Sequence, residues 1–139
     1  MADAAAQKVI SADSCFVCGE NNPIGLKTRF SIDRDAQTSY ASLTLRDDFQ
    51  GWQDVVHGGI LATLLDEACA YACLSHADNC VTAEINVRYR KPVRVGATVE
   101  VFGRLLDSRR KVWKAEAQIK INGALHAEAQ AKLFVQISG

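Results

Sequence analysis

The sequence predicts an α+β fold in which a curved, mostly antiparallel β-sheet wraps around one long central α-helix. Three observations predict it. One helical segment, residues 57–75, is apolar almost all round, which is typical of a helix buried on most sides. Segments on both sides of it alternate apolar and polar residues with the period of strands. The later segments are joined by short turns, and successive hairpins build an antiparallel sheet that can cover the helix.

Two strands are expected before the helix. Leu26–Ile32 and Ser39–Leu45 both alternate apolar and polar residues, and Asp33–Gln37 between them has the composition of a hairpin turn. Residues 1–12 are rich in alanine and weakly patterned. We therefore expect a disordered tail over residues 1–12 and a single domain over residues 13–139.

Three or four antiparallel strands are expected after the helix. Val81–Tyr89 alternates, with the odd-numbered, mostly apolar residues expected on one face, and Thr98–Leu106 and Val112–Ile121 follow. Asn122-Gly123 is a strong signal for a type I′ hairpin turn into Ala124–Ile137. That last segment is rich in alanine and has helical character. The preceding Asn-Gly and the alternating pattern favour a strand.

Composition narrows the class of protein. The chain has 139 residues, 48% of them hydrophobic, and a net charge of zero, which argues against global disorder and against generic polyanion binding. Its longest apolar run is too short for a membrane span, and its N-terminus lacks the pattern of a signal peptide. We therefore expect a cytoplasmic protein whose five cysteines are reduced thiols.

The cysteines suggest a metal site only weakly. Cys15 and Cys18 form a CxxC pair, which is half of a typical zinc site, but no second pair at suitable spacing is evident. Cys69 and Cys73 lie one turn apart in the apolar helix, where small buried residues are expected. We favour structural roles for all of them and expect no metal ion and no cofactor.

Two adjacent carboxylates in the helix are the main candidates for chemistry. Asp66 and Glu67 are its only formal charges, and carboxylates are rarely fully buried without a partner. Asp66 shares its helix face with small residues, which leaves room for a ligand or a second helix, whereas Glu67 shares its face with bulky ones. Asp66 is therefore the preferred catalytic residue. Glu67 is the alternative carboxylate and is expected to find a hydrogen-bonding or ionic partner.

The sequence His57-Gly58-Gly59 opens the helix. Glycines allow a ligand to come close to the first turn, and the N–H groups there can polarise a carbonyl or hold an oxyanion. The alternative is that the glycines merely fit a tight turn. Gly58 and Asp66 are separated by roughly 12 Å along one helix axis. Two antiparallel copies would bring Gly58 of one near Asp66 of the other, so a shared site predicts at least a symmetric dimer.

Most of the chain resembles the hotdog-fold acyl-CoA thioesterases, in particular the PaaI-like and THEM4-like branch of the 4-hydroxybenzoyl-CoA thioesterase superfamily. The resemblance is carried by Cys15-Phe-Val-Cys-Gly19, Asn22-Pro-Ile-Gly-Leu26, Phe49-Gln-Gly-Trp52, Val56-His-Gly-Gly59, Leu65-Asp66 and Thr82-Ala-Glu-Ile-Asn-Val-Arg-Tyr89 with Pro92. It implies a hotdog fold.

The resemblance also implies residue roles. The Gly58 N–H would bind the thioester carbonyl, and His57 would set the loop around it. Asp66 would act as general base on water or as nucleophile, and Thr82 would orient the carboxylate or the water. One branch of relatives has Asn six residues before the His, where this chain has Gly51. Gln50 or Gln53 is the candidate replacement for that side-chain donor.

Basic residues gather in one part of the chain. Residues 88–114 hold nine Lys and Arg against Glu100 and Asp107, whereas residues 1–87 hold five basic and twelve acidic residues. Such a cluster suits the phosphates of coenzyme A, although a solvated strand face is an equal alternative. Nucleic-acid binding is disfavoured because aromatic residues make up only 7% and no recognised motif is present. The candidate substrate-binding residues are Gly59, Trp52, Gln53, Asn86, Arg88, Arg90 and Lys91.

The sequence thus predicts a thioesterase that hydrolyses an acyl- or aryl-CoA, with coenzyme A as part of the substrate. The expected assembly is a homodimer or a homotetramer, with no nucleic-acid or membrane partner. Two alternatives stay open. One is a hotdog-fold hydratase or dehydratase, and the other is a non-catalytic acyl-CoA-binding or sensor protein, because fold alone does not separate these functions.

Overall fold

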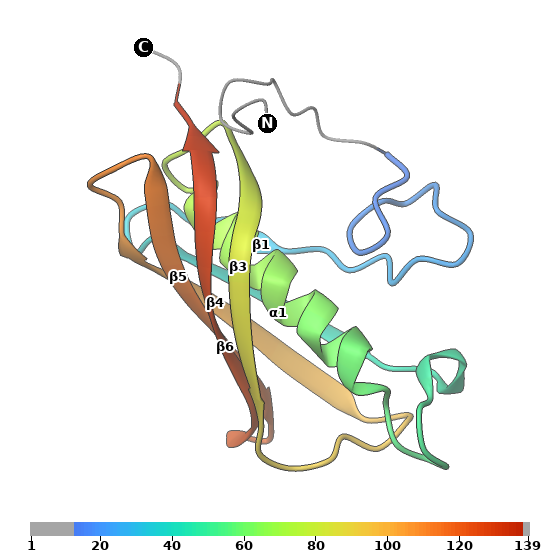
Figure 1. Cartoon of the computed structure of the whole chain (residues 1–139). Helices are drawn as coiled ribbons and strands as arrows, with labels where there is room; N and C mark the ends of the chain where they lie inside the picture. The colour runs from blue at the N-terminus through green and yellow to red at the C-terminus, as the bar shows by residue number, and fades with distance from the viewer. Residues whose placement is uncertain (1–12, 138–139) are drawn as a thin grey trace.

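A computed structural model describes residues 13–137. Its elements are β1 (Ser31–Asp33), β2 (Thr38–Thr44), the short 3-10 helix η2 (Asp47–Phe49), α1 (Gly58–Cys73), β3 (Asn79–Tyr89), β4 (Thr98–Asp107), β5 (Val112–Ile121) and β6 (Ala124–Gln136). The strands form one antiparallel sheet in the order β1-β2-β4-β5-β6-β3. Figure 1 shows α1 lying across one face of this sheet. The predicted α+β architecture is confirmed, while the predicted tail, residues 1–12, lies outside the described residues.

The C-terminal part of the sheet follows the sequence pattern closely. Asn122 has φ of 49° and Gly123 has φ of 82°, so both central residues of the turn adopt the left-handed conformation that a type I′ turn requires. The alanine-rich segment after the turn is strand β6. The choice of strand over helix for this segment is confirmed.

The predicted strand at Leu26–Ile32 is wrong for most of its length, because only Ser31–Asp33 forms a strand. Leu26 and Thr28 are buried, which accounts for the alternating pattern. Their N–H groups donate to the carbonyl oxygens of Phe16 and Val17 at 2.9 and 2.8 Å. Residues 26–28 therefore pair with the chain around the CxxC sequence, and the pairing with β2 begins only at Ser31.

Helix α1 packs against the sheet through its apolar side chains. Its buried residues are Leu61, Leu64, Leu65, Ala68, Cys69, Ala72 and Cys73. The sheet contributes both small and large side chains to this core. The small ones are Ala115, Ala117, Ala127, Ala129 and Ala131, and the large ones include Val99, Val101, Trp113, Ile119 and Leu133. Cys69 and Cys73 are fully buried in this core, as their small size predicts. Within residues 13–137 no helix combines the length and apolarity needed to cross a membrane.

Gly103 on β4 sets how closely the helix approaches the sheet. A Cβ atom added at Gly103 would lie 2.2 Å from the carbonyl oxygen of Ala68 and 2.4 Å from Oγ of Ser39. Ser39 on β2 donates a hydrogen bond of 2.7 Å to that same carbonyl. The helix backbone therefore rests directly on the sheet at this point, where no side chain can be accommodated.

Strand β3 changes the face it presents part-way along. Thr82 pairs with Leu133 and Glu84 pairs with Lys132, so Ala83 is an extra residue that forms a β-bulge. Leu133 is buried and Lys132 is exposed. The bulge therefore turns Thr82 toward α1 and turns Glu84 and the later even-numbered residues to the outer face. The predicted single face for Val81, Ala83 and the later odd-numbered residues is wrong for this reason.

Gly103→Val is expected to lower the free energy of unfolding by about 1–3 kcal/mol, because the helix must move away from the sheet. Urea denaturation measures the change. Ser42→Ala, at an exposed position on β2, is the control and should stay within about 0.5 kcal/mol of the parent chain. A Gly103→Val protein as stable as the parent would contradict the close contact.

Candidate active site

The start of α1 is held by His57. Its Nδ1 atom accepts a hydrogen bond of 2.9 Å from the Gly59 N–H, and its carbonyl oxygen accepts from Ile60 and Leu61. Nδ1 therefore carries no proton, and the imidazole serves as the N-cap of the helix. The Gly58 N–H makes no hydrogen bond within residues 13–137. One donor at the positive end of the helix thus stays available to a ligand.

Tyr89, for which the sequence pattern predicts no separate role, supports the same turn from the end of β3. Its hydroxyl donates a hydrogen bond of 2.7 Å to the carbonyl oxygen of Gly58. A Cβ atom added at Gly58 would lie 3.3 Å from the Tyr89 ring, so glycine lets the ring pack against the backbone. Tyr89 thereby fixes the peptide that follows the available N–H group. Its place at the end of the strand after the helix was the one sequence feature that could have indicated this contact.

Asp66 lies in the middle of α1 and is half-buried. Thr82 Oγ1 donates a hydrogen bond of 2.6 Å to Asp66 Oδ1. The bulge at Ala83 makes this contact possible, since it turns Thr82 toward the helix. The second carboxylate oxygen, Oδ2, makes no hydrogen bond with any residue between 13 and 137. The structure thus brings Asp66 and Thr82 together and leaves one carboxylate oxygen for a water molecule.

The structure does not bring Gly58 and Asp66 together within one chain. They are the first and the ninth residues of α1, which separates them by roughly 12 Å along the axis. The available N–H group and the oriented carboxylate therefore cannot contact the same carbonyl group in a single copy.

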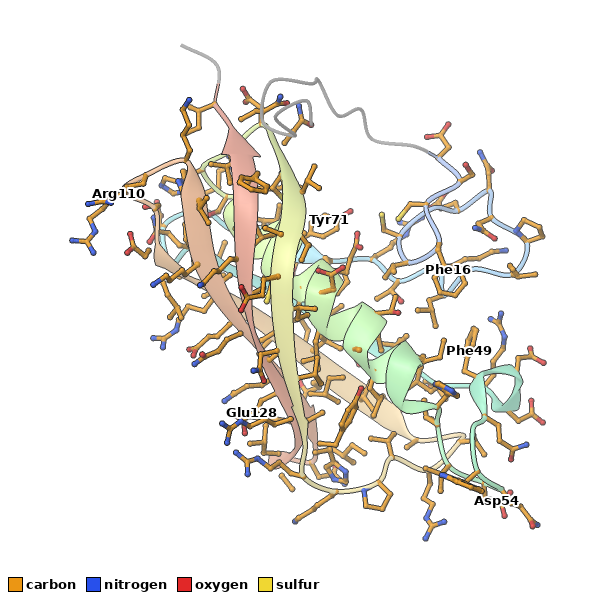
Figure 2. All side chains as sticks on the ribbon, in the orientation of Figure 1. Phe16, Phe49, Asp54, Tyr71, Arg110 and Glu128 are labelled. Atoms are coloured by element: carbon orange, nitrogen blue, oxygen red, sulfur yellow. The ribbon has the colours of Figure 1, made fainter. Side chains whose placement is uncertain are left out.

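The loop before α1 holds the candidate substrate-binding residues Trp52 and Gln53 and the candidate side-chain donor Gln50 near the start of the helix. Trp52 is 86% exposed, and Gln53 is exposed. The Gln50 side chain accepts a hydrogen bond of 2.6 Å from the N–H of Asp54, which Figure 2 labels at the tip of this loop. A Cβ atom at Gly51 would lie 3.0 Å from Cα of His57. Position 51 is therefore in direct contact with the capping residue.

The candidate phosphate-binding residues lie on the other side of the sheet. Asn86, Arg88 and Arg90 line a surface cavity together with Glu128 and Gln130, and Arg90 forms an ion pair of 2.9 Å with Glu128. Figure 2 shows Glu128 on the side of the sheet away from α1. Lys91 is exposed just beyond β3. Since β3 is an edge strand, these residues lie around the edge of the sheet from Asp66 and Thr82.

Glu67 faces a different neighbourhood from Asp66. The Cys18 sulfur lies within 4.8 Å of a Glu67 carboxylate oxygen, and Cys18 also interacts with the Tyr71 hydroxyl. Burial raises the pKa of Glu67, and interaction with Cys18 opposes this shift only in part. Burial also raises the pKa of Cys18 to about 12, so the free thiol is neutral at physiological pH. The Tyr71 ring stacks on Phe30 at 5.1 Å between ring centres.

Comparison with known proteins agrees with the architecture. Residues 53–124 match the family described as the thioesterase superfamily. The dehydratase FabZ of Nitratidesulfovibrio vulgaris, which acts on 3-hydroxyacyl-[acyl-carrier-protein], is 30% identical over 109 residues, covering 70% of this chain and 71% of that protein. The acyl-coenzyme A thioesterase THEM4 of Rattus norvegicus is 31% identical over 90 residues, covering 63% of this chain but only 38% of that protein.

Two crystal structures illustrate the shared fold. A thioesterase superfamily protein superposes with a TM-score of 0.81 at 23% identity, covering 89% of this chain and 61% of that one. A Streptococcus mutans protein bound to acetyl CoA superposes with a TM-score of 0.73 at 20% identity, covering 86% of this chain and 98% of that one. The antiparallel sheet around one central helix is the hotdog fold, and the chain belongs to the thioesterase superfamily.

Proposed function

We propose that this protein is an acyl-CoA thioesterase that hydrolyses an acyl- or aryl-CoA thioester to the free acid and coenzyme A. The observation that carries the proposal is the hydrogen bond between Thr82 and Asp66, which orients a half-buried carboxylate for work on water. Membership of the thioesterase superfamily supports it. Similarity to an acyl-coenzyme A thioesterase and to a protein that binds acetyl CoA supports the choice of substrate class.

In this reaction the Gly58 N–H activates the thioester carbonyl. It lies at the positive end of α1 and makes no hydrogen bond within residues 13–137. A thioester carbonyl oxygen that accepts from this N–H becomes more polarised. The same N–H then stabilises the negative charge that develops on the oxygen during attack. His57 and Tyr89 hold the two sides of the turn in place.

Asp66 activates the attacking water. As general base, it takes a proton from water while the water oxygen attacks the carbonyl carbon, with Thr82 fixing the orientation of the carboxylate. The tetrahedral intermediate then collapses, the C–S bond breaks and coenzyme A leaves as the thiolate. A thiolate is a good leaving group, so the site needs no strong general acid. Direct attack by Asp66 on the carbonyl is the alternative use of the same atom.

One chain cannot both activate the carbonyl and activate the water, because Gly58 and Asp66 are too far apart on one helix. Two copies with antiparallel α1 helices place Gly58 of each copy near Asp66 of the other. Such a symmetric dimer contains two equivalent sites. The basic residues Arg88, Arg90 and Lys91, with Asn86, lie around the β3 edge, where a long coenzyme A moiety passing over that edge would meet them. The same dimer can pair again into a tetramer.

Dehydration of a 3-hydroxyacyl thioester is the second candidate, because FabZ is among the similar proteins. Elimination needs a base for the α-proton and an acid for the leaving hydroxyl, usually a paired His and carboxylate. In this chain Nδ1 of His57 is already used as the helix cap, which favours a positioning role. A screen of acyl- and aryl-CoA esters for thiol release detects a thioesterase, and an assay of 3-hydroxyacyl-CoA for loss of water detects a dehydratase. A non-catalytic binding protein gives neither signal.

Asp66→Asn is expected to lower kcat for hydrolysis by on the order of 10²–10⁴, because the general base is lost. Acyl-CoA binding should persist. A thiol-trapping assay measures the rate, and calorimetry measures the binding. Glu67→Gln should retain measurable turnover. Loss of turnover in Glu67→Gln together with full turnover in Asp66→Asn would move the catalytic role to Glu67.

Hybrid dimers test the shared site. Gly58→Pro removes the N–H donor and adds a ring beside Tyr89. Proline is tolerated at the first helical position, and His57 already has the extended backbone that precedes a proline. Mixed one to one with Asp66→Asn chains, the Gly58→Pro chains should form hybrids with one intact site. About a quarter of the parent activity should then return, because half of the dimers are hybrids and each carries one of two sites. Mixtures as inactive as the separate variants would rule out a site made from two chains.

Tyr89→Phe tests the support of the Gly58 turn. Loss of a hydrogen bond worth about 0.5–1.5 kcal/mol should lower kcat by roughly two- to tenfold, with KM little changed. Tyr40→Phe is the matched control, since its hydroxyl bonds to Glu100 on β4 rather than to α1. A change confined to KM, or an equal loss in both variants, would contradict the positioning role of Tyr89.

A further inference from the structure

The segment 13–28 packs beside α1 on the side of Glu67, and its CxxC turn is tightly built. The Gly19 N–H donates a hydrogen bond of 2.9 Å to the Cys15 carbonyl oxygen. A Cβ atom at Gly19 would lie within 2.3–2.6 Å of backbone atoms of Asp13 and Cys15, so the turn requires glycine there. Figure 2 shows this segment, marked by Phe16, on the side of the helix away from the sheet.

This turn presents both thiols to one carboxylate of α1. The sulfur atoms of Cys15 and Cys18 and a carboxylate oxygen of Glu67 all lie within 4.8 Å of one another. In a tetrahedral zinc site, bonds of about 2.3 Å to sulfur and about 2.0–2.2 Å to oxygen hold the ligand atoms about 3.5–3.8 Å apart. The three side chains therefore need only small shifts to share one ion.

Within the part of the chain that the structure describes, no ion pair supplies the cluster with a positive charge. Among the ion pairs within residues 13–137, none includes Glu67. The thiol of Cys18, which lies beside the Glu67 carboxylate, is at most a weak hydrogen-bond donor. A partly desolvated carboxylate beside two thiols is an environment that a divalent cation with affinity for sulfur stabilises. Thiolate ligands favour zinc over magnesium or calcium.

We propose that Cys15, Cys18 and Glu67 bind one zinc ion that fastens the segment 13–28 to α1. On binding, the two thiols release their protons to solvent, and the ion is held by two thiolates, one carboxylate and a water molecule. The Tyr71 hydroxyl, which interacts with Cys18, then donates to a coordinated sulfur. The role is structural, because the ion joins two segments 49 residues apart in the chain and lies on a different helix face from Asp66.

Cobalt binding tests the site without any measurement of activity. Untagged, reduced protein is stripped of metal with a chelator and titrated with Co²⁺. The parent chain is expected to bind one Co²⁺ per chain, with the near-ultraviolet absorption of a thiolate–cobalt bond. Cys15→Ser and Cys18→Ser should each lose most of this absorption, and Glu67→Gln should weaken binding by roughly tenfold or more. Cys80→Ser, a half-buried thiol outside the cluster, is the control and should bind as the parent does.

Alkylation of the unmutated chain covers the case in which the variants fail to fold. Zn²⁺, but not Mg²⁺, is expected to protect Cys15 from iodoacetamide, as read by mass spectrometry of its peptide. Protection by both ions, or by neither, would overturn the proposal. So would absence of the thiolate–cobalt absorption in the reduced parent chain, or its persistence in folded Cys15→Ser and Cys18→Ser proteins.

Discussion

The close packing of α1 against the sheet at Gly103 is the constraint on which the rest of the structure depends. Gly103 and the hydrogen bond from Ser39 hold the helix backbone against the sheet. Because the helix cannot move outward without losing this contact, both of its functional regions have fixed positions relative to β3. That strand then contacts the helix at both functional regions, through Tyr89 at the Gly58 turn and through Thr82 at Asp66.

Much of this fold could be predicted because its signals are local. The Asn122-Gly123 turn and the strand at Val112–Ile121 depend on neighbours in the chain, and the structure reproduces both. The segment at Leu26–Ile32 misled the prediction, since its alternation reflects burial while its hydrogen bonds go to Phe16 and Val17. Burial and strand pairing are separate properties, and alternation reports only burial.

The candidate site was predictable only in part. The small-residue face of α1 pointed to Asp66, whereas Thr82 was reached through resemblance to relatives, and its contact with Asp66 depends on a bulge that no residue pattern announced. The contacts of Tyr89 with Gly58, and of Cys18 with Glu67, join residues 31 and 49 positions apart. Spacing along a chain carries no information about such distant pairs. The catalytic roles themselves stay predictions.

The extra residue at Ala83 has a consequence for how this strand can change. With regular alternation, Thr82, Asn86 and Arg88 would all project to the same side of the sheet. If that side were the outer one, the Asp66 carboxylate would lose Thr82 as its partner. If it were the inner one, Arg88 would be forced into the apolar interior. One inserted residue lets a single strand serve a buried neighbour at one end and solvent at the other. Shortening the strand by that residue would reverse one half of it, so the length of β3 here is constrained independently of the identity of its side chains.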